Sequence, residues 1–505
     1  MGFFGREKIS VPPHPRQEPR IDLPLCLESL EQVFDGCADF SHRAVDLGGD
    51  PAKKLTLCYI GGMVRMERVS DYVLRPLAQD KTLAVGNLAG ALGRIRDGAL
   101  YNLSVEERTT MDEAVFDLIG GNCLLLFPGE SVCLSFNTGT EEKRSVSEPE
   151  NEPPIKGPRD SFVESIRTNT SLVRRRLRAP SLKIKELLVG RQSVTPVDIL
   201  WIEGLTDPEL VKAVERRIDA IDIDALIATG NLEEYIVDDL HTPFPLVATT
   251  ERPDRFTAGV VEGRVGILVD GLPLGWLVPG TISQFFKTPQ DKSQSWMVAS
   301  MLTVLRYLCM LTTLFLPALY IAAVTFHPEM LPTKLTLSII AAKQDVPFTT
   351  IFEVLILLIA FEIIQEAGLR LPSSIGQTVS ILGGLVVGSA AVEARIVSPA
   401  VLIVVAIAGI AGYTMPSQDL AGALRLWRFL LALCASVGGL FGIAAGAAAL
   451  VFHLAGIESF GVAYLTPFAA NAGEQVEGRT VLRQPLPRAK LREAALKTRN
   501  RRNQK

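Results

Sequence analysis

A long apolar block, residues 307–453, constrains this 505-residue chain more than any other feature, because charged residues are sparse within it. A helix needs about 20 mostly apolar residues to cross the hydrocarbon core of a bilayer. We therefore predict an α-helical multi-span membrane domain over residues 291–470. Five stretches approach the required length: 307–326, 348–369, 375–392, 395–415 and 429–453.

The chain on either side of this block carries many more charges. Residues 1–290 contain 33 Lys and Arg against 43 Asp and Glu, whereas residues 479–505 contain ten basic residues and one acid, Glu493. The first 20 residues lack the apolar core of a signal peptide, so we expect the front of the chain to stay in the cytoplasm. This division excludes a single soluble enzyme.

The acidic front and the basic tail together set a condition on the topology. Positive residues beside membrane helices favour the cytoplasmic side, so the tail should end on the same side as the front. Five full crossings would separate the two ends. We therefore expect an even number of crossings. One stretch would cross only halfway, or the short charged segment 331–346 would enter the membrane with a neighbour.

The soluble part contains one pattern twice. A short apolar run is followed by apolar residues at helical spacing and, further on, by a hairpin. In the second copy the helix should begin at Pro208 with Asp207 as its N-cap. The repeat predicts an α+β cytoplasmic region of two similar subdomains, residues 22–136 and 161–290. The matching segments are strands at 57–63 and 199–205 and hairpins at 123–134 and 258–269.

Three further segments have no periodic apolar pattern. Residues 1–21 are expected to be a disordered N-terminus, and residues 137–160 form a polar, Pro-rich linker between the subdomains. Residues 471–505 are expected to be a basic cytoplasmic tail.

An arginine-rich segment, 161–178, opens the second subdomain. Its apolar residues fall at helical spacing, and Ser161 with Glu164 fits a capping box. One interpretation is a solvated, partly interfacial helix; the other is a docking surface for acidic partners or anionic lipid headgroups. Composition does not choose between them. The candidate docking residues are Arg167, Asn169, Arg174, Arg175 and Arg176.

Small residues recur four positions apart in two of the apolar stretches. Such faces let helix backbones approach closely, since lipid provides no hydrophobic drive for association. We predict tight helix packing there, and a channel wall lined by small residues is the alternative. The residues are Gly376, Ser380, Gly384 and Gly388 in one stretch and Gly438, Gly442 and Gly446 in the other.

Carboxylates in the second apolar stretch need an explanation, because ionisable groups are costly inside a bilayer. Glu353 is explained by a capping box with Thr350, and Glu366 by pairing with Arg370 one turn later. Glu362 has neither explanation, so it must face protein or water. It is either a buried, hydrogen-bonded group or part of a polar pathway. The candidate residues of an ion pathway are Glu362, Gln365 and Glu366.

The motifs of several enzyme classes are missing from the sequence. The seven cysteines include no C-x-x-C pair, the five histidines are scattered, and no nucleophile elbow, phosphate-binding loop or H-E-x-x-H motif occurs. We therefore expect no catalytic residue, no metal site, no cofactor and no nucleic-acid partner.

Several short segments, in order along the chain, carry a resemblance to one known family. They include KGPRDSFVE at 156–164, PFP at 243–245, TERPD at 250–254, FHPEMLPT at 326–333 and FEIIQEAGLRLP at 361–372. With these segments the chain resembles the A-subunit family of GerA-type spore germinant receptors over residues 22–470. One departure lies before the first apolar stretch, where Thr-Pro-Gln-Asp-Lys-Ser at 288–293 replaces the family's usual Ser-Pro-Glu-Asp-Tyr-Tyr.

The resemblance implies a membrane subunit of a nutrient receptor in the inner membrane of the dormant spore. It implies a transporter-like B subunit and a lipoprotein C subunit as partners. It also implies a homo-oligomer that forms a gated ion channel. Two alternatives remain: a related spore membrane channel without its own nutrient-sensing partner, and a proton-coupled secondary transporter. The second is weakened because the block lacks repeated broken helices.

Overall fold

The computed structural model describes residues 21–100, 104–139, 149, 152, 156–370, 388–468, 482–485, 487 and 491–503. The chain forms two compact units. The first contains Met1–Val237, Val247–Pro279 and Pro485–Lys505, and the second contains Asp238–Leu246 and Gly280–Gln484. The predicted disordered N-terminus and most of the predicted linker lie outside the described residues.

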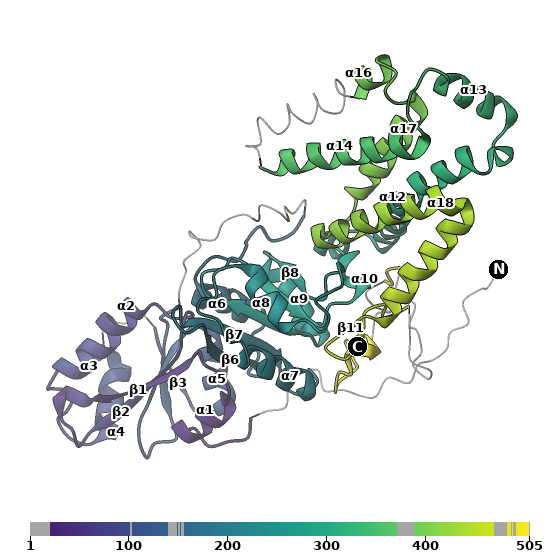
Figure 1. Ribbon diagram of the computed structural model, residues 1–505. Helices are drawn as coiled ribbons and strands as arrows, with labels where there is room; N and C mark the ends of the chain where they lie inside the picture. The colour runs from purple at the N-terminus through teal and green to yellow at the C-terminus, as the bar shows by residue number, and fades with distance from the viewer. Residues whose placement is uncertain are drawn as a thin grey trace. The chain divides into compact units, whose positions relative to one another are not determined.

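The first subdomain is a five-stranded antiparallel sheet between two apolar layers (Figure 1). Helices α1 (Leu27–Val33) and α5 (Met111–Gly120) supply one layer. The π-helical segment Val69–Leu74, α3 (Arg75–Gln79) and α4 (Leu88–Arg94) supply the other. The strands are β1 (Phe40–Asp46), β2 (Lys54–Ile60), β3 (Val105–Arg108), β4 (Cys123–Leu126) and β5 (Cys133–Phe136), in the order β1-β2-β4-β5-β3.

The second subdomain repeats this plan. Its order, β6-β7-β9-β10-β8, is the order of the first sheet strand for strand. The α+β architecture predicted from the repeat is therefore confirmed for this part of the chain. The strands are β6 (Leu182–Val189), β7 (Thr195–Ile202), β8 (Ala248–Thr250), β9 (Val265–Val269) and β10 (Gly275–Val278). The helices are α6 (Ile166–Arg176), α7 (Pro208–Asp219), α8 (Thr229–Ile236) and α9 (Pro253–Glu262).

Local signals gave mixed results in these subdomains. The hairpin at 123–134 is β4–β5, and the Asp207 side chain caps α7 by accepting from the backbone N–H of Glu209 at 3.1 Å. The prediction of a hairpin at 258–269 was wrong. Helix α9 occupies the first part of this segment, because Phe256 and Val260, one turn apart, both pack into the core. The true hairpin is β9–β10.

The predicted capping box at Ser161 was also wrong. Helix α6 begins only at Ile166, and the residues before it are extended. The N–H of Phe162 donates to the carbonyl of Glu251 at 2.7 Å, which ties this segment to the chain beside β8. A long-range backbone bond therefore outweighs the local helix signal.

The second unit is helical. Two of its described helices, α12 and α18, are long and apolar enough to cross a membrane, and α17 is a shorter apolar helix. The predicted stretch 375–392 lies mostly outside the described residues. The helices are α10 (Ile282–Phe285), α11 (Pro289–Ser293), α12 (Trp296–Thr325), α13 (Thr333–Lys343), α14 (Thr350–Arg370), α16 (Gly388–Glu393), α17 (Pro399–Gly412) and α18 (Gln418–Gly456). A short ladder, β11 (Glu458–Ser459) and β12 (Val462–Ala463), follows.

Helix α18 folds back on itself at Gly439. This residue has φ +55° and ψ −134°, outside the helical region. The rings of Trp427 and His453 lie 5.8 Å apart, whereas a straight helix would separate residues so distant in sequence by about 39 Å. Figure 1 shows the sharp bend in the ribbon. The last apolar stretch is therefore two helical halves in contact, not one span.

The segments that precede α12 and follow α18 pair with each other. The N–H of Ile282 donates to the carbonyl of Tyr464 at 2.9 Å, and the N–H of Gly280 donates to the hydroxyl of Ser459 at 3.1 Å. Further on, the backbone N–H of Arg483 donates to the hydroxyl of Ser300, near the start of α12, at 2.9 Å. The chain therefore leaves the helical unit beside the place where it enters.

The described end of the basic tail belongs to the first unit. The Arg492 side chain donates to the carbonyl of Val261 at 2.9 Å, and the N–H of Arg499 donates to the carbonyl of Leu205 at 3.0 Å. Leu496 is buried. This part of the predicted tail packs on the second α+β subdomain.

Candidate functional sites

The first candidate site is the junction between the two α+β subdomains, where α6 lies against the turn that follows β2. Gly62 in that turn has φ +79°. A Cβ at this position would lie 2.7 Å from the carbonyl oxygen of Arg167. Glycine is therefore required by both backbone conformation and close approach.

A buried ion pair fastens this junction. The Arg174 guanidinium donates from Nε and Nη2 to the two carboxylate oxygens of Asp39, at 2.6 and 2.8 Å, and from Nη1 to the carbonyl of Leu182 at 3.1 Å. The Arg174 side chain is fully buried and that of Asp39 is 1% exposed. Burial lowers the pKa of Arg174, but the charge of Asp39 and the hydrogen bonds to it together outweigh this effect and leave the pKa above its ordinary value.

A second, incomplete ion pair lies at the other end of α6. Arg167 donates to Glu186, and its Nη1 lies 3.8 Å from a carboxylate oxygen of Asp198, beyond hydrogen-bonding distance. Asp198 is fully buried on β7, and neither of its carboxylate oxygens accepts a hydrogen bond from the described residues. Burial raises the pKa of Asp198 to about 7.

The predicted docking surface on this helix needs correction. Asn169 and Arg174 lie in the interior: the Asn169 amide accepts from the N–H of Val163 at 2.8 Å and donates to its carbonyl at 2.6 Å. Arg176 pairs with Asp160, and Arg175 is half-buried. The sequence shows a charged helix but not the acids, such as Asp39, that fold onto it.

The second candidate site is an ionic cluster between α14 and α18. The Glu362 carboxylate accepts from Arg425 Nη1 at 3.1 Å and also pairs with Arg428, whose side chain is only 2% exposed. Sequence analysis missed both partners, which lie more than 60 residues away. Their spacing, three residues apart within an apolar helix, was the signal that could have found them. The cluster has two cations for one acid.

Gln365 and Glu366 lie next to this cluster on α14. Gln365 lines a cavity of about 20 Å³ together with Arg425 and Arg428. This space is close to the minimum for one water molecule. Glu366 is exposed and lines an apolar depression that also contains Glu362. The structure thus brings the three predicted pathway residues together beside two arginines. The Arg370 side chain, predicted to pair with Glu366, lies outside the described residues.

Glu353 caps a different helix from the one predicted. It is fully buried, and its Oε2 accepts from the backbone N–H of Ser398, the N-cap residue of α17, at 2.8 Å. Its Oε1 lies 3.2 Å from Lys343 Nζ. A carboxylate at a helix N-terminus is favoured by the helix dipole. Glu353 therefore joins α13, α14 and α17 and does not form the predicted capping box with Thr350.

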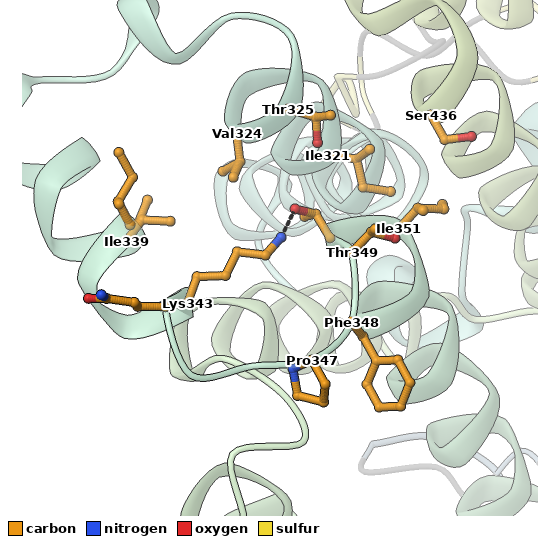
Figure 2. Close-up of a pocket in the computed structure, with 13 residues that line it drawn as sticks. Ile321, Val324, Thr325, Ile339, Lys343, Pro347, Phe348, Thr349, Ile351 and Ser436 are labelled. Carbon is orange, nitrogen blue, oxygen red and sulfur yellow. Dashed lines mark hydrogen bonds between the residues drawn. The ribbon is translucent and has the colours of Figure 1, made fainter.

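A groove of about 630 Å³ opens beside this contact. It is lined mainly by apolar side chains of α12, α13 and α14. Figure 2 shows Lys343 extending across it, where Nζ donates to the hydroxyl of Thr350. Lys343 is the cation among the described residues that line the groove, and it already pairs with Glu353.

The predicted small-residue faces behave differently from one glycine to the next. A Cβ on Gly442 would lie 2.0 Å from the carbonyl oxygen of Cys434, and one on Gly446 would lie 2.8 Å from a methyl of Leu431, whereas Gly438 faces open space. Gly442 and Gly446 therefore pack against the first half of α18 itself. A Cβ on Gly388 would lie 3.4 Å from a methyl of Leu402. Gly376, Ser380 and Gly384 lie outside the described residues.

The start of α12 is held by another ion pair. Arg306 donates to both carboxylate oxygens of Asp291, at 2.7 and 3.0 Å, and to the carbonyl of Phe286 at 2.9 Å. Asp291 also completes a capping box with Thr288 at the start of α11. Arg306 and Asp291 therefore join the start of α12 to α11.

Comparisons with known proteins give a consistent picture. The family model for Bacillus/Clostridium GerA spore germination proteins matches residues 28–495. The chain is 39% identical to the uncharacterized membrane protein YfkQ of Bacillus subtilis over 89% of this chain and 87% of that protein. It is 37% identical to spore germination protein B1 (86% and 89%) and 36% identical to spore germination protein KA (87% and 80%), both of Bacillus subtilis.

A solved structure is also similar in sequence. The crystal structure of the N-terminal domain of the A subunit of the Bacillus megaterium spore germinant receptor GerK3 is 26% identical. The match covers 52% of this chain and 97% of that domain, with a TM-score of 0.40.

Proposed function

Because the chain belongs to the GerA family of spore germination proteins, of the germinant receptor A-subunit type, we propose that it is the channel-forming membrane subunit of a nutrient receptor. In this proposal it acts in the spore inner membrane as a homo-oligomer with B-type and C-type subunits. It performs no catalysis. Opening of the oligomer releases ions and starts germination.

One observation carries the channel proposal: the cluster of Glu362, Arg425 and Arg428 in an otherwise apolar region. Charged groups inside a membrane are expensive, face protein or water, and mark ion or substrate pathways. Here one carboxylate binds two guanidinium groups, and Glu366 lies one turn further along α14. This site holds more charged side chains than a single structural ion pair needs, which favours a hydrated pathway next to α14.

The proposed topology has a cytoplasmic front and an even number of crossings. The described tail residues 491–503 pack in the same compact unit as the α+β subdomains, so both must lie on one side of any membrane. The chain also leaves the helical unit beside the start of α12. In this proposal the fold-back at Gly439 is the half-crossing or return that an even count needs.

The experiment compares variants of this cluster in spores, measuring both protein abundance and ion release after nutrient addition. Glu362→Gln leaves the buried Arg428 without its counter-charge, which costs about 3–5 kcal/mol for a buried pair. We therefore expect reduced abundance. The double variant Glu362→Gln with Arg428→Gln removes both charges and should restore abundance.

The double variant decides between pathway and scaffold. If the cluster lines the conducting path, ion release stays low although the protein has returned to normal levels. Normal ion release at normal abundance would make the cluster purely structural and remove the main support for the channel proposal. Glu329→Gln, at an exposed residue before α13, is the matched control and should change neither readout.

A further inference from the structure

Asp198 is an unusual residue for the interior of an α+β subdomain. It is fully buried, and both of its carboxylate oxygens lack a hydrogen-bond donor among the described residues. In the part of the chain that the structure describes, the cation beside Asp198 is Arg167, whose Nη1 lies 3.8 Å away and is itself buried without a hydrogen bond. A buried charge without partners is strongly disfavoured, so the neutral acid is the form that suits this site.

The charges that face Asp198 come from several elements. Glu186 on β6 lies directly opposite Asp198 in the strand register and holds Arg167 of α6 through its own ion pair. Asp270, which follows β9, and Asp39 of the first subdomain add further negative charge. Arg174 does not compensate Asp198, because its guanidinium is already committed to Asp39. Two carboxylates therefore compete for the Arg167 guanidinium.

Arg167 also contributes to the contact between the subdomains. Its carbonyl oxygen lies where a Cβ on Gly62 of the first subdomain would be only 2.7 Å away. Closing the 3.8 Å gap to a hydrogen bond takes a shift of the guanidinium by roughly 1 Å, and the attraction pulls on the first turn of α6, which carries Arg167. Any shift of that turn alters its close fit against Gly62.

We propose that this junction is a pH-sensitive switch. Ionisation of Asp198 draws Arg167 away from Glu186 and weakens the packing of α6 against the first subdomain. At acidic pH Asp198 is neutral, Arg167 stays with Glu186 and the two subdomains are tightly joined. Above neutral pH the end of the junction at Arg167 opens more often, while the Asp39–Arg174 pair still holds the other end of α6. The cytoplasmic part of the protein would thereby respond to a change in internal pH.

The direction of the pH effect follows from linkage. Burial raises the pKa of Asp198 to about 7, above its ordinary value near 4. Between these values the folded junction binds a proton that the opened state does not, so its stability falls as pH rises. The stabilisation is complete below about pH 4 and is lost as pH rises through 7. Between pH 6 and pH 8 the opening equilibrium should increase about tenfold.

Hydrogen–deuterium exchange on the purified full chain in mild detergent tests the proposal. After correction for the intrinsic exchange rate, amides of residues 166–171 and 61–64 should open about tenfold more at pH 8 than at pH 6. In Asp198→Asn, which cannot ionise, this difference should disappear. Asp222→Asn, at an exposed aspartate paired with Arg191, is the matched control and should keep the difference.

Two results would overturn the switch: no pH-dependent opening in the unmodified protein, or the same opening in Asp198→Asn. If Asp198→Asn does not fold, Arg167→Met provides the second test. Without the guanidinium, ionised Asp198 has no group to draw away from Glu186, so the pH-dependent opening should disappear. The same opening in Arg167→Met as in the unmodified protein would show that Arg167 does not couple Asp198 to the junction.

Discussion

The buried ion pair of the α+β unit and the ionic cluster of the helical unit are stabilised in apolar surroundings in different ways. Asp39 and Arg174 match each other with two hydrogen bonds and no net charge. Glu362 is shared by Arg425 and Arg428, and its side chain is 23% exposed. Complete neutralisation suits a permanent contact between subdomains. A partly exposed cluster of three charged side chains suits a site that ions or water can enter.

Breaking the neutral pair should give the largest loss of stability. Asp39→Asn leaves the Arg174 guanidinium buried without a counter-charge, for which we expect a loss of about 3–5 kcal/mol. Thermal unfolding of the purified chain would measure it. Asp222→Asn, which removes an exposed pair, should cost no more than about 1 kcal/mol. Equal losses in both variants would contradict the structural role of the Asp39–Arg174 pair.

The second prediction concerns the helical unit, where close packing at glycine, and not an ion pair, holds the two halves of α18 together. Gly442→Ala places a methyl group 2.0 Å from the carbonyl oxygen of Cys434, so the halves of the helix must separate. Overpacking of this kind costs about 1–3 kcal/mol. Gly438→Ala, one turn earlier and facing open space, is the matched control. Thermal unfolding in detergent should separate the two variants, and identical values would refute the fold-back.

Local features of this fold were predictable because neighbours in sequence determine them. The cap at Asp207, the β4–β5 hairpin and the repeat of two α+β subdomains follow from periodicity and turn chemistry. The strand prediction for segment 258–262 was wrong because a run of small and β-branched residues is compatible with a strand or with a buried helix. The packing of Phe256 into the core favours the helix.

The candidate sites were less predictable because their parts come from distant positions. Glu362 was recognised as needing a partner, but Arg425 and Arg428 reach it only through the packing of α14 against α18. The same holds for Asp39, which turns a predicted surface arginine into an interior one. Gly439 was overlooked because a single glycine in an apolar, glycine-rich run does not reveal a positive φ.

The central claim, that Glu362 faces an ion pathway, is tested most directly by modifying this position. Cys309 and Cys434 are first replaced by Ala, and Glu362→Cys is then treated with a water-soluble, positively charged thiol reagent. Ile363→Cys, at a side chain 64% exposed on the same helix, is the control. We predict that modification at 362 changes nutrient-triggered ion release, whereas treatment of the 363 variant does not. Ion release unaffected by labelling at 362 would contradict the account.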